Sequence, residues 1–309
     1  MANTNHLDFR HLFFEANSIF NRSAGLNDLK ASFSDVLITS AIAKCLDYNR
    51  SSQSVNSDTP SFFLVANARA MCEELIYCSV FRYVGDQSAD DLAKKLNNLS
   101  TLDNVHTQTR FFALNNRLQP TLGGFKESTA QKAAIKRASS AVLDVWKRLG
   151  LSSTGDRRPP TIRQLSHRVG LCTTYDYVYS LTSKFVHFSP AQLFRLGWGP
   201  MDGPFSFCVD SFEGYFSSLA RFLGVLIFLG YCHLATEKFG LCIANRYADT
   251  IAKQLQSGFR WPEITTFEEM NQTAPDSIIT RLLMTIVRED TPNAMPDVLT
   301  ELEGLAKLR

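Results

Sequence analysis

An uninterrupted apolar run in the last third of the chain limits what the protein can fold into. Phe222–Cys232 has no charged residue over 11 positions and is bracketed by Arg221 and His233. A helix needs about 20 apolar residues to cross a bilayer, and extending the run back to Tyr215 would bring Arg221 into the span at a cost of a few kcal/mol. We therefore expect a helix buried at the centre of a soluble fold. A membrane-associated protein is the weaker alternative.

Elsewhere the apolar residues recur at helical spacing rather than in the alternation of strands. Two polar loops rich in Ser, Pro and Gly divide the chain at 50–60 and 150–160. No βαβ alternation is visible, so the pattern predicts an all-α fold, a multi-helix bundle. Glycines and prolines between Gln192–Leu196 and Phe205–Val209 also allow a short β-hairpin near 192–209. The predicted helices cover about 8–49, 61–84, 88–118, 126–149, 161–169, 172–188, 211–235, 237–257, 276–289 and 296–308.

Domain organisation and cell compartment follow from composition. No linker requires two domains, so we expect one helical domain at 1–258, with its core at about 30–235, and a C-terminal helical appendage at 259–309. Seven scattered cysteines without a CxxC pair predict reduced, buried thiols in a cytoplasmic protein. The N-terminus lacks the basic start and apolar run of a signal peptide.

A pair of opposite charges in the helix predicted at 61–84 is the first candidate for a site. Arg69 and Glu73 are four residues apart, the spacing of an intrahelical ion pair. Their neighbours are almost all apolar, and charges are costly to bury unless they are paired. The two residues are either a buried structural pair or members of a functional site.

A second candidate is the helix predicted at 172–188, which we expect Pro190 to end. Tyr179, Ser183 and His187 are spaced four apart and so lie on one face. At about 1.5 Å of rise per residue, Ser183 and His187 can serve one small ligand, whereas Tyr179 lies about 12 Å from His187 along the axis. The alternative is a histidine that only anchors the following loop, since a cationic side chain is favoured at a helix C-terminus.

Other chemistries find little support. The chain has no G-x-S-x-G elbow for a serine hydrolase, and its six histidines show no metal-ligand spacing, so we expect no metal. Without a Walker-type loop or G-x-G-x-x-G, we expect no nucleotide cofactor. The net charge of +2 gives no global reason for nucleic-acid binding. A local basic patch is suggested by Lys132, Lys136, Arg137, Lys147, Arg148, Arg157, Arg158, Arg163 and Arg168, although a solvated helix face explains most of these residues.

The Arg-x-x-x-Glu helix, followed by Tyr-x-x-x-Ser-x-x-x-His, resembles a family of uncharacterised bacterial helical proteins similar to the HEPN superfamily. The resemblance covers about 30–235. It implies an all-α bundle and, in active members, metal-independent RNA cleavage at a homodimer interface, often in toxin or antiphage systems. The chain departs from the superfamily signature of Arg followed after four to six residues by His, because Arg163 and His167 have only three residues between them.

Two functions therefore stay open. In the first, the protein acts on RNA: His187 is the acid or base, Arg69 or Lys184 stabilises negative charge, and Ser183 positions a phosphate. In the second, the same residues, with Glu73 and Tyr179, form a non-catalytic module that senses a ligand or binds a protein.

Overall fold

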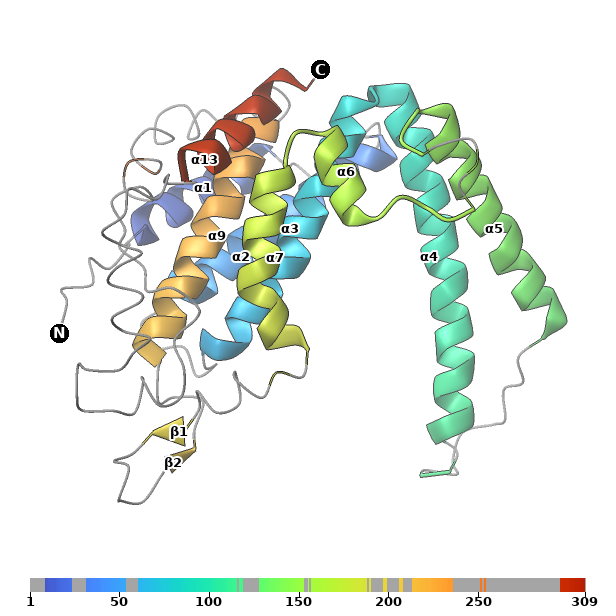
Figure 1. Ribbon diagram of the computed structural model, residues 1–309, viewed down its shortest axis with the longest axis horizontal. Coiled ribbons are helices and arrows are strands. Elements are labelled where there is room, and N and C mark those ends of the chain that lie inside the picture. The colour runs from blue at the N-terminus through green and yellow to red at the C-terminus, as the bar shows by residue number, and fades with distance from the viewer. Residues whose placement is uncertain are drawn as a thin grey trace.

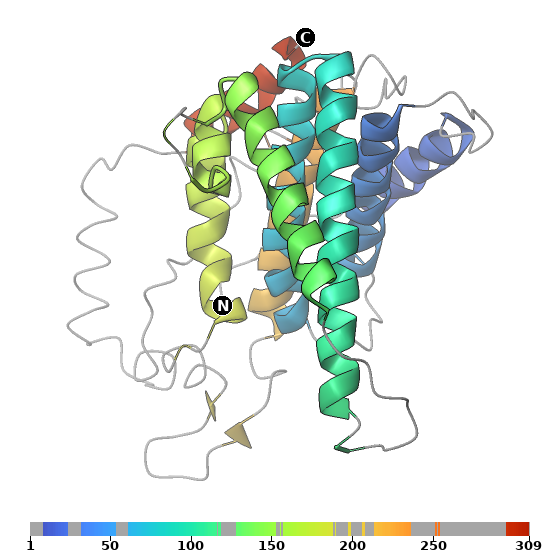
Figure 2. The same cartoon turned by 90° about the vertical axis from the view of Figure 1, so that its right-hand side faces the viewer.

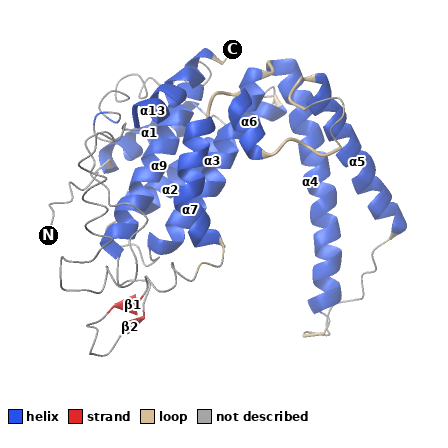
Figure 3. Ribbon diagram, in the orientation of Figure 1, coloured by secondary structure: helices blue, strands red, loops and turns tan. Residues whose placement is uncertain are grey.

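The structure is a computed structural model, and nearly all of its described residues are helical (Figure 3). They are residues 9–23, 32–53, 61–115, 117–118, 128–152, 155, 157–187, 189, 197–198, 206–207, 213–235, 251, 253 and 295–308. The elements are α1 (Arg10–Ser23), α2 (Phe33–Gln53), α3 (Ser61–Tyr83), α4 (Asp86–Asn115), α5 (Thr129–Arg148), α6 (Ile162–Arg168), α7 (Cys172–Val186), β1 (Gly197–Trp198), β2 (Ser206–Phe207), α9 (Glu213–Ala235), α13 (Met295–Gly304) and the 3₁₀ helix η2 (Leu305–Lys307). The predicted all-α bundle is confirmed.

Two helices, α3 and α9, form the centre of the bundle. They pack against each other, α2 packs against both, and α7 lies along α3 (Figures 1 and 2). Both central helices are apolar around most of their circumference, which is typical of helices enclosed by others. The residues of α9 between Phe222 and Tyr231 are all buried, so the apolar run is core, as its length predicted.

Close packing around α9 depends on two of its glycines. A Cβ atom at Gly224 would lie 2.6 Å from Cε1 of Tyr48, and one at Gly230 would lie 2.6 Å from Cδ2 of Leu75. Asn49 stabilises the same helix crossing, because its Nδ2 donates to the carbonyl of Gly224 at 3.0 Å.

Among the described residues one stretch, Phe216–Leu234, is long and apolar enough to span a membrane, and 78% of it is buried inside the fold. A core helix of a soluble protein has the same properties.

A hairpin of two helices, α4 and α5, extends beside the bundle (Figure 1). The chain turns from α3 into α4 at Gly85, whose φ of 80° is the left-handed conformation that glycine adopts without strain. The start of α5 is encoded locally, since Ser128 and Gln131 form a reciprocal capping box. Trp146, which is fully buried near the end of α5, contacts the ring of Tyr77 and so joins the hairpin to α3.

The C-terminal helix α13 packs against α7 and α9 (Figure 1). Its Val298, Leu299 and Leu302, with Leu305 of η2, are buried in the same core cluster as α3 and α9. A domain boundary at 258 stays a prediction, since residues 259–294 lie outside the described part of the chain. The helix predicted at 276–289 lies there too, and of the one predicted at 237–257 only residues 251 and 253 are described.

The hairpin near 192–209 is present as a short antiparallel pair. Gly197 pairs with Phe207 and Trp198 with Ser206. The second strand falls within the predicted Phe205–Val209. The predicted first strand, Gln192–Leu196, lies outside the described residues, and the paired residues follow directly after it.

Candidate functional site

The ion pair predicted on α3 forms and is half-buried. Nε of Arg69 donates to Oε1 of Glu73 at 3.0 Å, and 22% and 31% of the two side chains are exposed. The pair lies on the side of α3 that faces α7. Because neither charge is fully removed from water, the pair does not carry the full desolvation cost expected of a buried one.

The neighbouring helix α7 ends two residues earlier than its spacing suggested. Its last helical residue is Val186, and His187 is the C-cap, with an extended backbone at φ −111° and ψ 158°. The N–H of His187 still donates to the carbonyl of Ser183 at 3.1 Å. The predicted end at 188 was therefore two residues too late. Proline has no N–H, so Pro190 cannot supply the bond that would continue the helix over the carbonyl of Val186.

The guanidinium of Arg69 joins the two candidate helices. Its NH1 lies 3.1 Å from Nε2 of His187, and its Cζ lies 4.6 Å from the ring centroid of Tyr179. Because a guanidinium can only donate, Nε2 of His187 accepts in this contact and the ring proton is on Nδ1. One arginine thus contacts both Tyr179 and His187. The sequence had predicted that these two residues lie too far apart along the helix axis to serve one small ligand. We call Arg69, Glu73, Tyr179 and His187 the Arg69–His187 cluster.

The cluster faces water on one side and phenol rings on the other. His187 is exposed and Tyr179 is 36% exposed. The ring of Tyr179 packs at 5.6 Å against that of Tyr175, which is buried. Burial raises the pKa of Tyr175, and the negative charge of Glu73 raises it further. Tyr175 therefore stays a neutral phenol beside the ion pair.

The two remaining candidates, Ser183 and Lys184, lie near the C-terminal end of α7. Ser183 contributes its main-chain carbonyl to His187. Lys184 is half-buried in the last turn of the helix. Their roles in binding a phosphate stay predictions from spacing.

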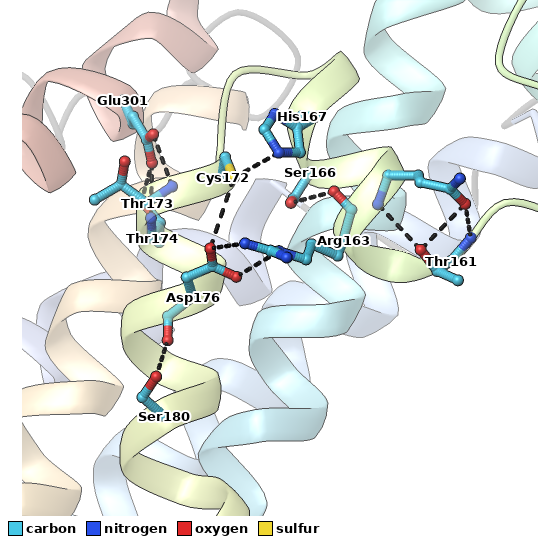
Figure 4. Close-up of polar contacts among 11 residues, drawn as sticks. Thr161, Arg163, Ser166, His167, Cys172, Thr173, Thr174, Asp176, Ser180 and Glu301 are labelled. Carbon is cyan, nitrogen blue, oxygen red and sulfur yellow. Dashed lines mark hydrogen bonds and ion pairs between the residues drawn. The ribbon is translucent and has the colours of Figure 1, made fainter.

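A second polar cluster, at the opposite end of α7, was not foreseen from the sequence (Figure 4). Arg163 of α6 makes a two-bond ion pair with Asp176 of α7, at 3.1 and 2.9 Å. Sγ of Cys172 lies 3.1 Å from Nε2 of His167 and 3.9 Å from Oδ2 of Asp176. A cysteine beside a histidine could have been noticed in the sequence, but nothing in the spacing shows that the two meet.

The chemistry of this second cluster argues against a nucleophilic thiol. Burial raises the pKa of Cys172, and the charge of Asp176 raises it further. A reactive cysteine needs the opposite shift, because the thiolate is the nucleophile. The other described cysteines, Cys45, Cys72, Cys78 and Cys232, are buried thiols. Among the residues that the structure describes, no group of three or more His, Cys, Asp or Glu side chains is arranged to hold a metal ion.

A carboxylate from the far end of the chain caps α7 (Figure 4). Glu301 of α13 accepts hydrogen bonds from the N–H of Thr173 at 2.9 Å, and from the N–H and Oγ1 of Thr174 at 2.7 and 2.8 Å. These are the second and third residues of the helix, the donors that a local N-cap side chain would satisfy. Leu171, at the N-cap, provides no side-chain bond. The C-terminal helix therefore caps the helix that leads to His187.

Comparison with known proteins gives one match. Residues 65–203 match the sequence model of a family described as "Family of unknown function (DUF5677)". The matched region holds α7 and the part of α3 from Val65 onward, and it includes all six candidate residues. No curated protein and no solved structure matches the chain. The match fits the expectation of an uncharacterised family.

Proposed function

We propose that the protein acts on RNA at the Arg69–His187 cluster, as a metal-independent ribonuclease-like or RNA-binding protein. We propose further that it is related to the HEPN superfamily and belongs to a bacterial defence or toxin-type system. One observation carries the proposal: the exposed imidazole of His187 lies 3.1 Å from the guanidinium of Arg69, beside the partly exposed ring of Tyr179. These groups supply a cation for a phosphate, an acid or base, and an aromatic surface for a nucleobase.

The proposed reaction begins when a phosphate of RNA takes the N–H of Arg69 away from Nε2 of His187. The freed lone pair of Nε2 then accepts the proton of the ribose 2′-hydroxyl. The 2′-oxygen bonds to phosphorus, the bond to the 5′-oxygen breaks, and the departing 5′-oxygen takes a proton from solvent. The imidazolium returns its proton to solvent. The products are a cyclic 2′,3′-phosphate and a 5′-hydroxyl, with Lys184 and Ser183 proposed to hold the phosphate.

The charge distribution also supports an RNA partner. Residues 101–170 contain twelve Lys and Arg against four Asp and Glu, a net charge of +8 in a chain whose total is +2. On α5, Lys132, Lys136, Arg137 and Arg148 are exposed, whereas the buried side of the helix is apolar. A local excess of positive charge attracts the phosphate backbone, and such binding weakens as salt rises.

The test is cleavage of a labelled single-stranded RNA by the purified full chain in EDTA. We expect cleavage to fall at least a hundredfold in His187→Ala and in Arg69→Ala, with the melting temperature measured alongside. His167→Ala is the matched control, because His167 is also exposed but belongs to the cluster with Cys172. Undiminished cleavage in His187→Ala would refute the assignment, and so would equal loss in His167→Ala.

The second candidate function is a non-catalytic module that senses a ligand or binds a protein. The observation that supports it is that Arg69 already donates hydrogen bonds to Glu73 and to His187, and so connects α3 with α7. In that case His187→Ala lowers the melting temperature by a few degrees or abolishes ligand binding, and neither it nor the parent chain cleaves RNA. We further propose that the protein is cytoplasmic, has no membrane partner and acts as a homodimer. Light scattering of the purified chain would test the homodimer.

A further inference from the structure

A groove on a different side of α3 from the Arg69–His187 cluster has the character of a small-molecule site. It lies between α2, α3 and α4 and has a volume of about 560 Å³. Most small-molecule sites measure about 300–1,000 Å³ and have mainly apolar walls with a few polar groups. The walls of this groove include Leu37, Ala41, Phe81 and Leu96.

The polar end of the groove is formed by Glu74 and Lys44. Glu74 follows Glu73 directly, and the turn of about 100° per residue sends the two carboxylates to different partners. Glu73 pairs with Arg69 beside α7, whereas Glu74 pairs with Lys44 of α2 beside the groove. The groove and the cluster therefore share a helix but no pairing residue.

The carboxylate of Glu74 makes fewer hydrogen bonds than it can accept. Oε1 accepts from Nζ of Lys44, but Oε2 is inaccessible to solvent and has no hydrogen-bond partner in the structure. A buried acceptor without a donor is costly, and a donor to a charged acceptor forms a strong bond. The side chain of Lys44 is 51% exposed and that of Glu74 36%, so water screens the ammonium more than the carboxylate.

We propose that this groove binds a small, mainly apolar molecule that carries an amine or hydroxyl group, whose N–H or O–H donates to the carboxylate of Glu74. The apolar body lies along Leu37, Ala41, Phe81 and Leu96. A cationic amine is favoured over a neutral hydroxyl because it also pairs with the carboxylate charge. A ligand with its own carboxylate is disfavoured, because it brings a second negative charge and no donor.

The test uses three probes with one apolar body: 1-naphthylmethylamine, 1-naphthalenemethanol and 1-naphthoic acid. Each is titrated against the full chain by ligand-observed NMR at neutral pH. We expect the amine to bind at least tenfold more tightly than the acid, with the alcohol between them. Glu74→Gln keeps the size of the side chain and removes its charge, so it should bring the amine and the acid within about threefold of each other.

Two further variants test the location. Ala41→Phe fills the groove and should abolish binding of all three probes. Ser40→Phe narrows the same groove from an exposed position on α2, and gives the same answer if Ala41→Phe does not fold. Asp103→Asn, exposed on α4, is the matched control and should leave binding unchanged.

Three results would overturn the proposal. They are failure of the amine to bind the folded chain up to its solubility limit, equal binding of the three probes, and binding that survives Ser40→Phe. The proposal stands apart from the proposed action on RNA: His187→Ala should leave probe binding unchanged, and Glu74→Gln should leave RNA cleavage unchanged.

Discussion

Replacing Glu301 by alanine should loosen α7, the helix that leads to His187. The carboxylate accepts three hydrogen bonds, from the N–H groups of Thr173 and Thr174 and from Oγ1 of Thr174. Thr174 is buried, so its donors have little access to water once the carboxylate is gone. The loss falls on a helix whose own N-cap, Leu171, has no side chain able to replace it.

The size of the effect follows from what is lost. Removal of an N-cap side chain costs about 0.5–2 kcal/mol, and hydrogen bonds to a charged group contribute about 1.5–3 kcal/mol each. These figures overlap, because the bonds are the cap, so we expect Glu301→Ala to lower the free energy of unfolding by about 2–3 kcal/mol. For a chain of this size that corresponds to a fall in melting temperature of roughly 5 °C.

The assay is thermal and urea unfolding followed by circular dichroism. Glu301→Gln keeps an acceptor oxygen without the charge and should lose about half as much. Glu303→Ala, on the exposed side of the same helix, is the control and should change stability by less than about 0.5 kcal/mol. In a double-mutant cycle with Thr174→Val, the two sites should couple by about 1 kcal/mol. Equal effects of Glu301→Ala and Glu303→Ala, or strict additivity in the cycle, would refute the capping role.

Two other predictions concern helix packing and pH. Gly224→Ala should lower the free energy of unfolding by about 1–3 kcal/mol, because its Cβ would lie 2.6 Å from the Tyr48 ring. Gly304 has a helical conformation and open space around it, so Gly304→Ala should instead raise the free energy of unfolding by about 0.4–1 kcal/mol in the same urea assay. The side chain of Lys94, then the N–H of Phe33, lowers the pKa of Asp90 below its ordinary 3.8. The ionised Asp90 therefore stabilises the folded state above about pH 4, and this contribution is lost as the pH falls through the lowered pKa. The melting temperature of Asp90→Asn should fall below that of the parent at pH 7, and the difference should shrink as the pH is brought toward 3.

Much of the candidate site could be predicted because its parts are local. The spacing of Arg69 and Glu73 predicted their ion pair, and the spacing along α7 placed Tyr179 and His187 on one face of the helix. The contact of that face with Arg69 of α3 is seen only in the structure. The prediction of a straight helix through His187 was wrong. That residue turns out of the helix, which brings its ring to Arg69.

What the sequence by itself determined is the helical character of the chain, the approximate positions of the helices from α3 to α7, and the burial of α9. Apolar spacing, the proline after α7 and the charge-free run of α9 act within a few residues of chain, so they can be read without knowing the fold. Only the tertiary structure decided which distant groups meet. Nothing in the sequence around Asp90 indicates that its carboxylate accepts from the first residue of α2. Nothing around Glu301 indicates that it caps α7, which is 127 residues away in the chain. The joining of Cys172 to His167 and Asp176 and the groove at Glu74 likewise depend on how helices pack, because side-chain partners are set by proximity in space and not along the chain.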